Sequence, residues 1–202
     1  MDSLEGIAGS LNHALAAAGL PIHPLSAVRG FIGNGARILI QRAAPVGSEE
    51  SRIDSLEKAF KDHYDFHWPA GTTPYDGIST LLETLQQRGY ALAVLSNKPH
   101  PFTVDMVKRL FPSIQFAAIL GQRVGIAHKP DPAGALEIAR SFGVDAKDCI
   151  IIGDSTMDIE TAHNAGMDSI AVTWGFHDRE RLIASKPSRI VGNPEEIAAA
   201  FP

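Results

Sequence analysis

Two aspartates with the spacing of a metal site, Asp154 and Asp158, follow directly after an apolar run, Cys149 to Ile152. We expect this run to form a strand buried on both faces, because a half-exposed strand would alternate with polar residues. A helix is expected to follow at once, with Gly166 as its left-handed cap. Asp154 then lies at the carboxyl end of the strand and Asp158 one helical turn further on, so both carboxylates can face one cavity. Mg²⁺ takes oxygen ligands of this kind and commonly adds water and phosphate.

The same pair also has a purely structural interpretation. An aspartate between a strand and a helix often caps the helix, and either Asp154 or Ser155 could do so here. Asp158 could equally be an exposed acid of the first helical turn, where the helix dipole favours negative charge. Taken alone, the pair leaves both interpretations open.

Three further polar residues are expected at the same edge of the sheet. An apolar strand expected over residues 90–95 runs into Ser96 and Asn97, which offer a hydroxyl, an amide and loop N–H groups for phosphate oxygens. Lys129 stands in a loop just before a helix that begins at Pro132, and its ammonium could neutralise a phosphate. Each residue has an ordinary alternative, since Ser and Asn build turns and loop lysines are usually solvated.

The elements that would position these residues alternate between helix and strand after residue 75. Alternation of this kind implies an α/β fold with a parallel, doubly wound sheet, which binds ligands at the carboxyl ends of its strands. Helices are expected over 76–88, 101–110, 132–142 and after Gly153, and strands over 90–95, 116–120, 149–152, 169–173 and 189–191.

Residues 4 to about 70 are expected to be helical throughout. Ile7, Leu11 and Leu15 recur at helical spacing, and Gly19-Leu20-Pro21 ends that first run. The stretch 68–74 is rich in Pro, Gly and Thr, and we interpret it as the hinge into the alternating part of the chain.

Composition narrows the class of protein and its partners. The 202 residues suffice for one sizeable core and a small second domain, and the net charge of −5 offers no basic field for nucleic acid or an anionic membrane. A single cysteine excludes an intrachain disulfide and fits a reducing, cytoplasmic setting. We expect neither secretion nor a membrane span, because no basic segment followed by an apolar one opens the sequence and no apolar run is long enough to cross a bilayer. The oligomeric state stays open.

The order of these motifs along the chain resembles that of the haloacid dehalogenase (HAD) superfamily of phosphatases. Its members carry a Ser or Thr after one strand, then a lysine, then an acidic pair after another strand. Residue by residue, the resemblance implies that Ser96 and Lys129 are catalytic and bind the phosphoryl group, with Asn97 beside them. It also implies that Asp154 ligates Mg²⁺ and that Asp158 supports the metal site.

The residues within and around these motifs are most similar to those of the phosphoglycolate phosphatase branch of that superfamily. The resemblance implies a Rossmann-like core formed by residues 1–8 and 72–202 and a small all-helical cap formed by residues 9–71. It also implies hydrolysis of a small phosphorylated metabolite such as 2-phosphoglycolate through an aspartyl phosphate, with Arg37 or Arg29 as possible contacts of a substrate carboxylate. The matching segments are Leu95-Ser96-Asn97-Lys98-Pro99, His128-Lys129-Pro130, Gly153-Asp154-Ser155, Ala165-Gly166-Met167 and Gly30-Phe31-Ile32-Gly33-Asn34-Gly35.

The chain departs from the family pattern at one motif. Family members begin with a strand that ends in Asp-x-Asp-Gly-Thr-Leu-x-Asp-Ser, and its two leading aspartates are the nucleophile and the general acid and base. Here Met1-Asp2-Ser3 matches only the last two residues. In the family that strand lies between those expected at 90–95 and 149–152. We therefore expect one of three outcomes: the sequence is part of a longer enzyme, another segment fills the central position, or the two flanking strands pair directly.

Two alternatives to a phosphatase remain open from the sequence. The missing aspartates favour a catalytically inactive protein that binds a phosphoryl ligand or acts in regulation. The same motifs also serve sugar phosphate mutases, which return the phosphoryl group to a sugar.

Overall fold

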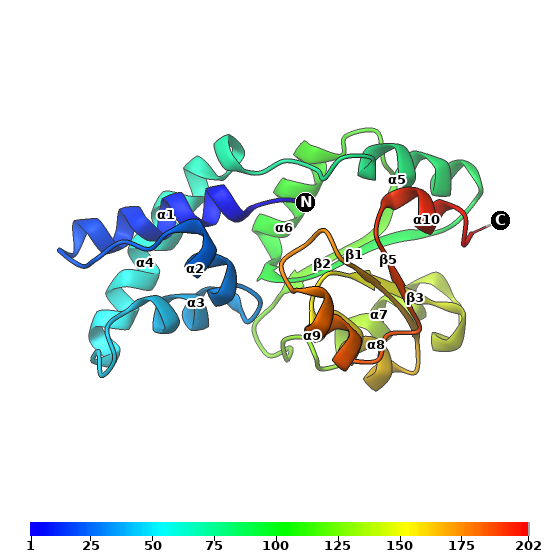
Figure 1. Ribbon diagram of the computed structural model, residues 1–202. Helices are drawn as coiled ribbons and strands as arrows, with labels where there is room; N and C mark the ends of the chain where they lie inside the picture. Colours follow the sequence, from blue (N-terminus) through cyan, green and yellow to red (C-terminus); the bar gives the residue numbers. More distant parts are fainter. Residues whose placement is uncertain (202) are drawn as a thin grey trace. The chain divides into compact units, whose positions relative to one another are not determined.

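The computed structural model describes residues 1–201 and divides into two compact units, Met1–Tyr75 and Asp76–Pro202 (Figure 1). No helix among the described residues is both long and apolar enough to cross a membrane.

The first unit is helical, as its apolar spacing predicts. Helix α1 packs against α4, and the side chains of Leu11 and Leu15 in α1 are completely buried. Asp2 and Thr73 exchange backbone hydrogen bonds of 2.7 and 2.9 Å, so the two ends of this unit lie side by side. Its elements are α1 (Leu4–Ala17), α2 (Leu25–Phe31), α3 (Gly35–Ala43), α4 (Glu50–His67) and a short 3₁₀ helix η1 (Trp68–Gly71).

The second unit alternates between helix and strand, and every strand pair in it is parallel, which confirms the expected α/β class. The sequence did not predict α9 and α10. Its elements are α5 (Ile78–Gln87), β1 (Leu92–Pro99), α6 (His100–Leu110), β2 (Phe116–Gln122), α7 (Ala133–Phe142), the 3₁₀ helix η2 (Ala146–Asp148), β3 (Ile150–Gly153), α8 (Thr156–Ala165), β4 (Asp168–Val172), α9 (Arg179–Ala184), β5 (Arg189–Val191) and α10 (Pro194–Ala198).

Helices of the second unit cover the strands from two directions. Helices α5 and α10 bury their apolar residues against β4 and β5, and Leu92 of β1 packs on the same cluster. A second cluster joins α7 to α8, and both Leu95 of β1 and Ile151 of β3 pack against it. These helices therefore hold β1 and β3 in one body, because each cluster contacts β1 as well as the strands that follow β2.

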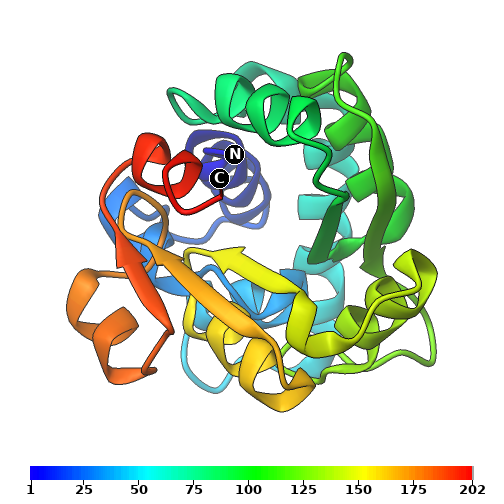
Figure 2. The same ribbon diagram turned by 90° about the vertical axis from the view of Figure 1, so that its right-hand side faces the viewer.

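The strands form two groups instead of one continuous sheet. Strand β1 pairs only with β2, and β3, β4 and β5 form a separate three-stranded sheet (Figure 2). Among residues 1–201, β1 and β3 do not pair with each other, and no strand pairs with both. Direct pairing of the flanking strands and filling of the central position by a described segment are therefore both wrong. The expectation of a longer enzyme stays a prediction.

The strand β3 is less buried than its sequence predicts. Ile150 and Ile152 are 42% and 39% exposed, so the expectation of burial on both faces is wrong for this strand. The physical reason is the unpaired edge, since β3 has a neighbour on one side only among the described residues. Strand β4, which has neighbours on both sides, buries all its residues from Ser169 to Val172.

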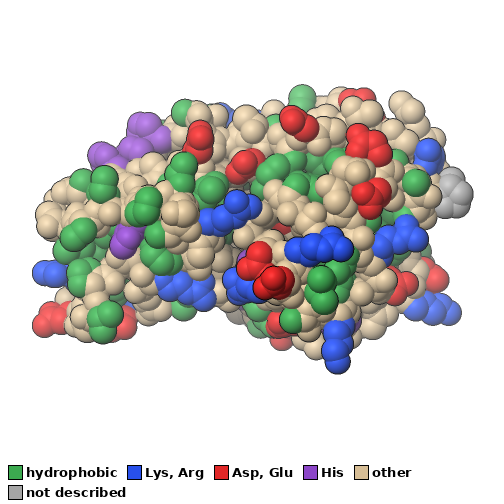
Figure 3. All heavy atoms as spheres, in the orientation of Figure 1, with side chains coloured by type: hydrophobic (Ala, Val, Ile, Leu, Met, Phe, Trp, Pro, Cys, Tyr) green, Lys and Arg blue, Asp and Glu red, His purple; other side chains and the backbone are tan. Residues whose placement is uncertain are grey.

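Three histidines of the first unit form a stack between α1 and α4. The ring centroids of His13 and His63 lie 4.0 Å apart, and those of His63 and His67 lie 3.8 Å apart. His63 Nδ1 also lies 3.0 Å from the hydroxyl of the buried Ser10. Histidine side chains gather visibly on the surface of this unit (Figure 3). Burial, and then the neighbouring charges of His13 and His67, lower the pKa of His63.

This stack predicts that the protein becomes less stable in mild acid. Because the pKa of His63 is lower in the folded than in the unfolded chain, folding disfavours its protonation, and stability falls as the pH drops below about 6.5. We expect the melting temperature to fall from pH 7.5 to pH 5.5 in the unmodified protein and to fall less in His63→Gln. Equal falls in the two proteins would contradict the prediction, and His163→Gln, outside the stack, serves as the control.

Candidate active site

The acidic loop at the end of β3 is organised around Asp158. Ser155 is the N-cap residue of α8, and both its backbone N–H and its hydroxyl donate to Asp158 Oδ2, at 3.1 and 2.7 Å. Asp158 is only 7% exposed, so the alternative of an exposed first-turn acid is wrong. Gly166 ends the helix with a φ of 69°, the left-handed cap expected from the sequence.

Lys129 reaches this acidic loop from the segment before α7. Its ammonium donates to Asp158 Oδ1 at 2.6 Å and to the carbonyl oxygen of Leu95 in β1 at 3.1 Å. The two charged side chains are 14% and 10% exposed, so the pair is buried and Lys129 is not a solvated loop lysine. One ammonium thereby connects β1 to the first turn of α8.

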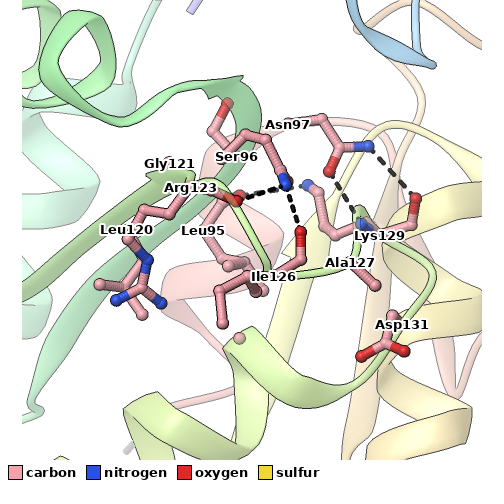
Figure 4. Close-up of a pocket in the computed structure, with 12 residues that line it drawn as sticks. Leu95, Ser96, Asn97, Leu120, Gly121, Arg123, Ile126, Ala127, Lys129 and Asp131 are labelled. Carbon is pink, nitrogen blue, oxygen red and sulfur yellow. Dashed lines mark hydrogen bonds between the residues drawn. The ribbon is translucent and has the colours of Figure 1, made fainter.

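Asn97 fixes the backbone of the same lysine. Its side-chain oxygen accepts from the Lys129 N–H at 2.8 Å, and its amide nitrogen donates to the Lys129 carbonyl at 3.2 Å (Figure 4). Both ends of the Asn97 amide are therefore used within the protein. The expectation that Asn97 binds phosphate stays a prediction, and the hydrogen bonds show a structural task for this residue.

Ser96, Asn97 and Lys129 line one pocket of the second unit (Figure 4). The strand β1 runs on through Ser96 and Asn97 to Pro99, four residues beyond the end that the apolar pattern predicts. Its register against β2 shifts between Leu95 and Pro99, where the polar residues replace the apolar ones. The Ser96 hydroxyl accepts from the Lys98 N–H at 3.1 Å. Asp131 is the one carboxylate in the lining, and it accepts from the Ala133 N–H at 2.8 Å.

Asp154 is held by the loop that follows β4. The Phe176 N–H donates to Asp154 Oδ2 at 2.8 Å, and the His177 N–H donates to the Asp154 carbonyl at 3.2 Å. A Cβ atom on Gly175 would overlap the Asp154 side chain, so only glycine fits at this position. Ser155 rather than Asp154 is the N-cap residue of α8, which answers the capping question that the sequence left open.

The two aspartates have opposite electrostatic environments. Burial, and then the negative charge of Asp158, raise the pKa of Asp154. Burial acts on Asp158 as well, but the charge and hydrogen bond of Lys129, together with the hydrogen bonds from Ser155, outweigh it and lower the pKa of Asp158. Neighbouring carboxylates whose pKa values are pushed apart in this way are suited to different tasks.

Asp154 is the carboxylate of this loop that could still accept a magnesium ion. Its Oδ1 accepts no hydrogen bond from the described residues, whereas both oxygens of Asp158 are occupied. A partly buried carboxylate with a raised pKa gains from a nearby cation. In residues 1–201, no three His, Cys, Asp or Glu side chains are arranged to hold a metal ion. A magnesium ion would complete its coordination with water and phosphate, as it commonly does.

Sequence reasoning missed His177 entirely. This residue is 8% exposed, and its Nδ1 accepts the Thr156 N–H at 3.1 Å. Burial, followed by the charge of Arg181, lowers its pKa. The signal that could have found it is its place just after β4, at the same sheet edge as Asp154.

The two arginines predicted to contact a substrate carboxylate lie in the first unit. The Arg37 guanidinium forms ion pairs with Glu50, with Asp54 at 2.7 Å and with Glu57 at 3.1 Å. Its charge is thus already compensated by three carboxylates. Arg29 lies in α2 and is exposed. Their role with substrate stays a prediction.

The chain is similar to known proteins over most of its length. The model of the haloacid dehalogenase-like hydrolase family matches residues 1–172. A phosphoglycolate phosphatase of Mesorhizobium japonicum is 34% identical over 196 residues, covering 96% of this chain and 86% of the relative. One of Agrobacterium fabrum is 36% identical over 205 residues, covering 100% of this chain and 86% of the relative. A crystal structure of a predicted phosphoglycolate phosphatase from Haemophilus somnus superposes with a TM-score of 0.90 at 29% identity, covering 99% of this chain and 92% of that one.

The chain therefore belongs to the haloacid dehalogenase-like hydrolase family. Within that family it is similar to phosphatases, since relatives at 28–36% identity over most of its length are named phosphoglycolate phosphatases.

The buried ion pair predicts a large loss of stability when only one partner is removed. Lys129→Met leaves the Asp158 carboxylate buried without its cation, and we expect the free energy of unfolding to fall by about 3–5 kcal/mol. The double variant Lys129→Met/Asp158→Asn removes both charges, so most of that loss should be recovered. Urea denaturation measures both values, and a double variant as unstable as the single one would contradict the interpretation.

Proposed function

We propose that the protein is a Mg²⁺-dependent hydrolase of small phosphorylated metabolites, with 2-phosphoglycolate as the substrate to test first. The observation that carries this proposal is the position of Lys129, whose ammonium joins the pocket lined by Ser96 to the carboxylate pair. The relatives named phosphoglycolate phosphatases support the choice of substrate.

Each residue of the site has a proposed task. The Lys129 ammonium and the Ser96 hydroxyl would bind the phosphoryl oxygens, and the buried position of Lys129 would make its charge more effective than it is in water. Asp154 would ligate Mg²⁺ through its free oxygen, while Asp158 would hold Lys129 in place. The ion, when bound, would offset negative charge that develops on the phosphoryl group. The helical residues 9–71 would form the cap over the substrate, and residues 1–8 and 72–202 the core.

The aspartyl-phosphate route further requires a carboxylate that attacks phosphorus. Both oxygens of Asp158 are engaged with Lys129 and Ser155, and Asp131, the carboxylate in the pocket lining, accepts from the Ala133 N–H. Neither is placed as a free nucleophile. This observation favours, as a second candidate function, a protein that binds a phosphoryl ligand without turning it over.

Phosphate release separates the two candidates. We expect the protein to release inorganic phosphate from 2-phosphoglycolate and from an aryl phosphate in the presence of Mg²⁺. Chelation with EDTA and Asp154→Ala should each lower the rate at least 100-fold. Asp145→Ala, an exposed aspartate before β3, is the matched control and should retain the wild-type rate.

The opposite outcome is equally informative. Absence of turnover, together with calorimetric binding of inorganic phosphate that Lys129→Met weakens, would establish the binding protein and exclude the hydrolase. A phosphorylated sugar that returns as its positional isomer, with no free phosphate, would identify a mutase instead.

A further inference from the structure

The loop after β4 forms three hydrogen bonds with Asp154 and with the first residue of α8. Three backbone N–H groups take part: those of Phe176 and His177 donate to Asp154, and that of Thr156 donates to His177. The first two bonds connect the loop to Asp154, and the third connects the helix back to the loop. Asp154 and the first residue of α8 are therefore fastened to one segment, residues 175–177.

The direction of the third hydrogen bond fixes the state of the His177 ring. A backbone N–H can only donate, so His177 Nδ1 must accept, and the neutral ring carries its proton on Nε2. The first N–H groups of a helix have no partner within the helix. Ser155 and Asp158 bond to each other, and His177, 21 residues away in sequence, supplies the acceptor for Thr156.

The backbone of this loop packs tightly against the Asp154 side chain. A side chain at position 175 would overlap the Asp154 carboxylate, so the backbone passes directly against it. The Phe176 N–H then engages Oδ2 and leaves Oδ1 as the oxygen without a hydrogen bond from the described residues. The loop thus selects which oxygen of Asp154 is available.

We propose that His177 is a positioning residue, which anchors the 175–177 segment to α8 so that Asp154 presents Oδ1 to a divalent cation. The inference rests on the magnesium site of the proposed function and adds to it a residue that contacts neither the cation nor the phosphate. Groups that orient a metal ligand in this way typically change metal affinity by 10–100-fold when they are removed.

The test measures cation binding in the absence of substrate. Mn²⁺ serves as the probe, because its free ion gives an electron paramagnetic resonance signal that disappears on binding. His177→Phe keeps a ring of similar size but has no acceptor, and we expect it to weaken Mn²⁺ binding at least tenfold. His177→Asn places an oxygen acceptor at the position of Nδ1, and it should bind Mn²⁺ within about threefold of the unmodified protein.

Controls separate this inference from the function on which it rests. Asp154→Asn should abolish binding, and His163→Phe, at the other end of α8, should not change it. If the unmodified protein binds Mn²⁺ and Asp154→Asn does not, but His177→Phe binds normally, the positioning role is wrong and the metal site stands. Equal losses in His177→Phe and His177→Asn would also overturn it, because the acceptor would then not matter. If Asp154→Asn binds as well as the unmodified protein, the metal site itself fails.

A second variant covers the case in which His177→Phe does not fold, as judged by circular dichroism. Gly175→Ala leaves His177 intact but drives a methyl group into the Asp154 carboxylate. We expect it to weaken Mn²⁺ binding at least tenfold as well. Unchanged binding in a folded Gly175→Ala protein would show that the segment does not position Asp154.

Discussion

The buried ion pair between Lys129 and Asp158 joins parts of the chain that share no strand pairing. Lys129 comes from the loop before α7, contacts the Leu95 carbonyl within β1, and meets Asp158 in the first turn of α8. Burying two charges is costly unless their geometry is good and the remaining atoms find partners. Here Ser155 takes the second oxygen of Asp158, and Asn97 holds the backbone of Lys129. The pocket and the acidic loop can therefore share one site.

The ion pair between Lys129 and Asp158 gives the two aspartates different electrostatic environments. The Asp158 carboxylate is paired with the Lys129 ammonium and accepts two hydrogen bonds from Ser155, so it is stable in its charged form inside the protein. Asp154 has one oxygen bound by the loop and lies beside a second negative charge, and both burial and that charge raise its pKa. A divalent cation bound to Asp154 would offset this concentration of negative charge. At Asp158, by contrast, a cation would have to displace Lys129. The structure thus supports the proposed division of labour between metal binding at Asp154 and positioning at Asp158.

Helices hold β1 and β3 together although the two strands belong to different sheets. Strands β1 and β3 each keep one unpaired edge among the described residues, and β3 exposes Ile150 and Ile152 as a result. Lys129 nevertheless links β1 to the helix that follows β3, and α7 and α8 pack on both Leu95 and Ile151. Apolar packing against the faces of the strands is independent of hydrogen bonds along their edges, so it can hold the strands without a common ladder.

The sequence by itself determined the class of the fold and the alternation of its helices and strands except for α9 and α10, because apolar periodicity and short motifs are local properties of the chain. Ser96, Lys129, Asp154 and Asp158 were singled out in this way, and their functional roles stay predictions. Only the tertiary structure decided which partner each one meets. The pairing of Lys129 with Asp158, the hydrogen bonds of Asn97 to the Lys129 backbone and the hydrogen bond of Thr156 to His177 join residues 21 to 32 positions apart. The exposure of β3 depends on a missing neighbour. No local pattern encodes such contacts, since burial and charge compensation arise only when distant segments pack together.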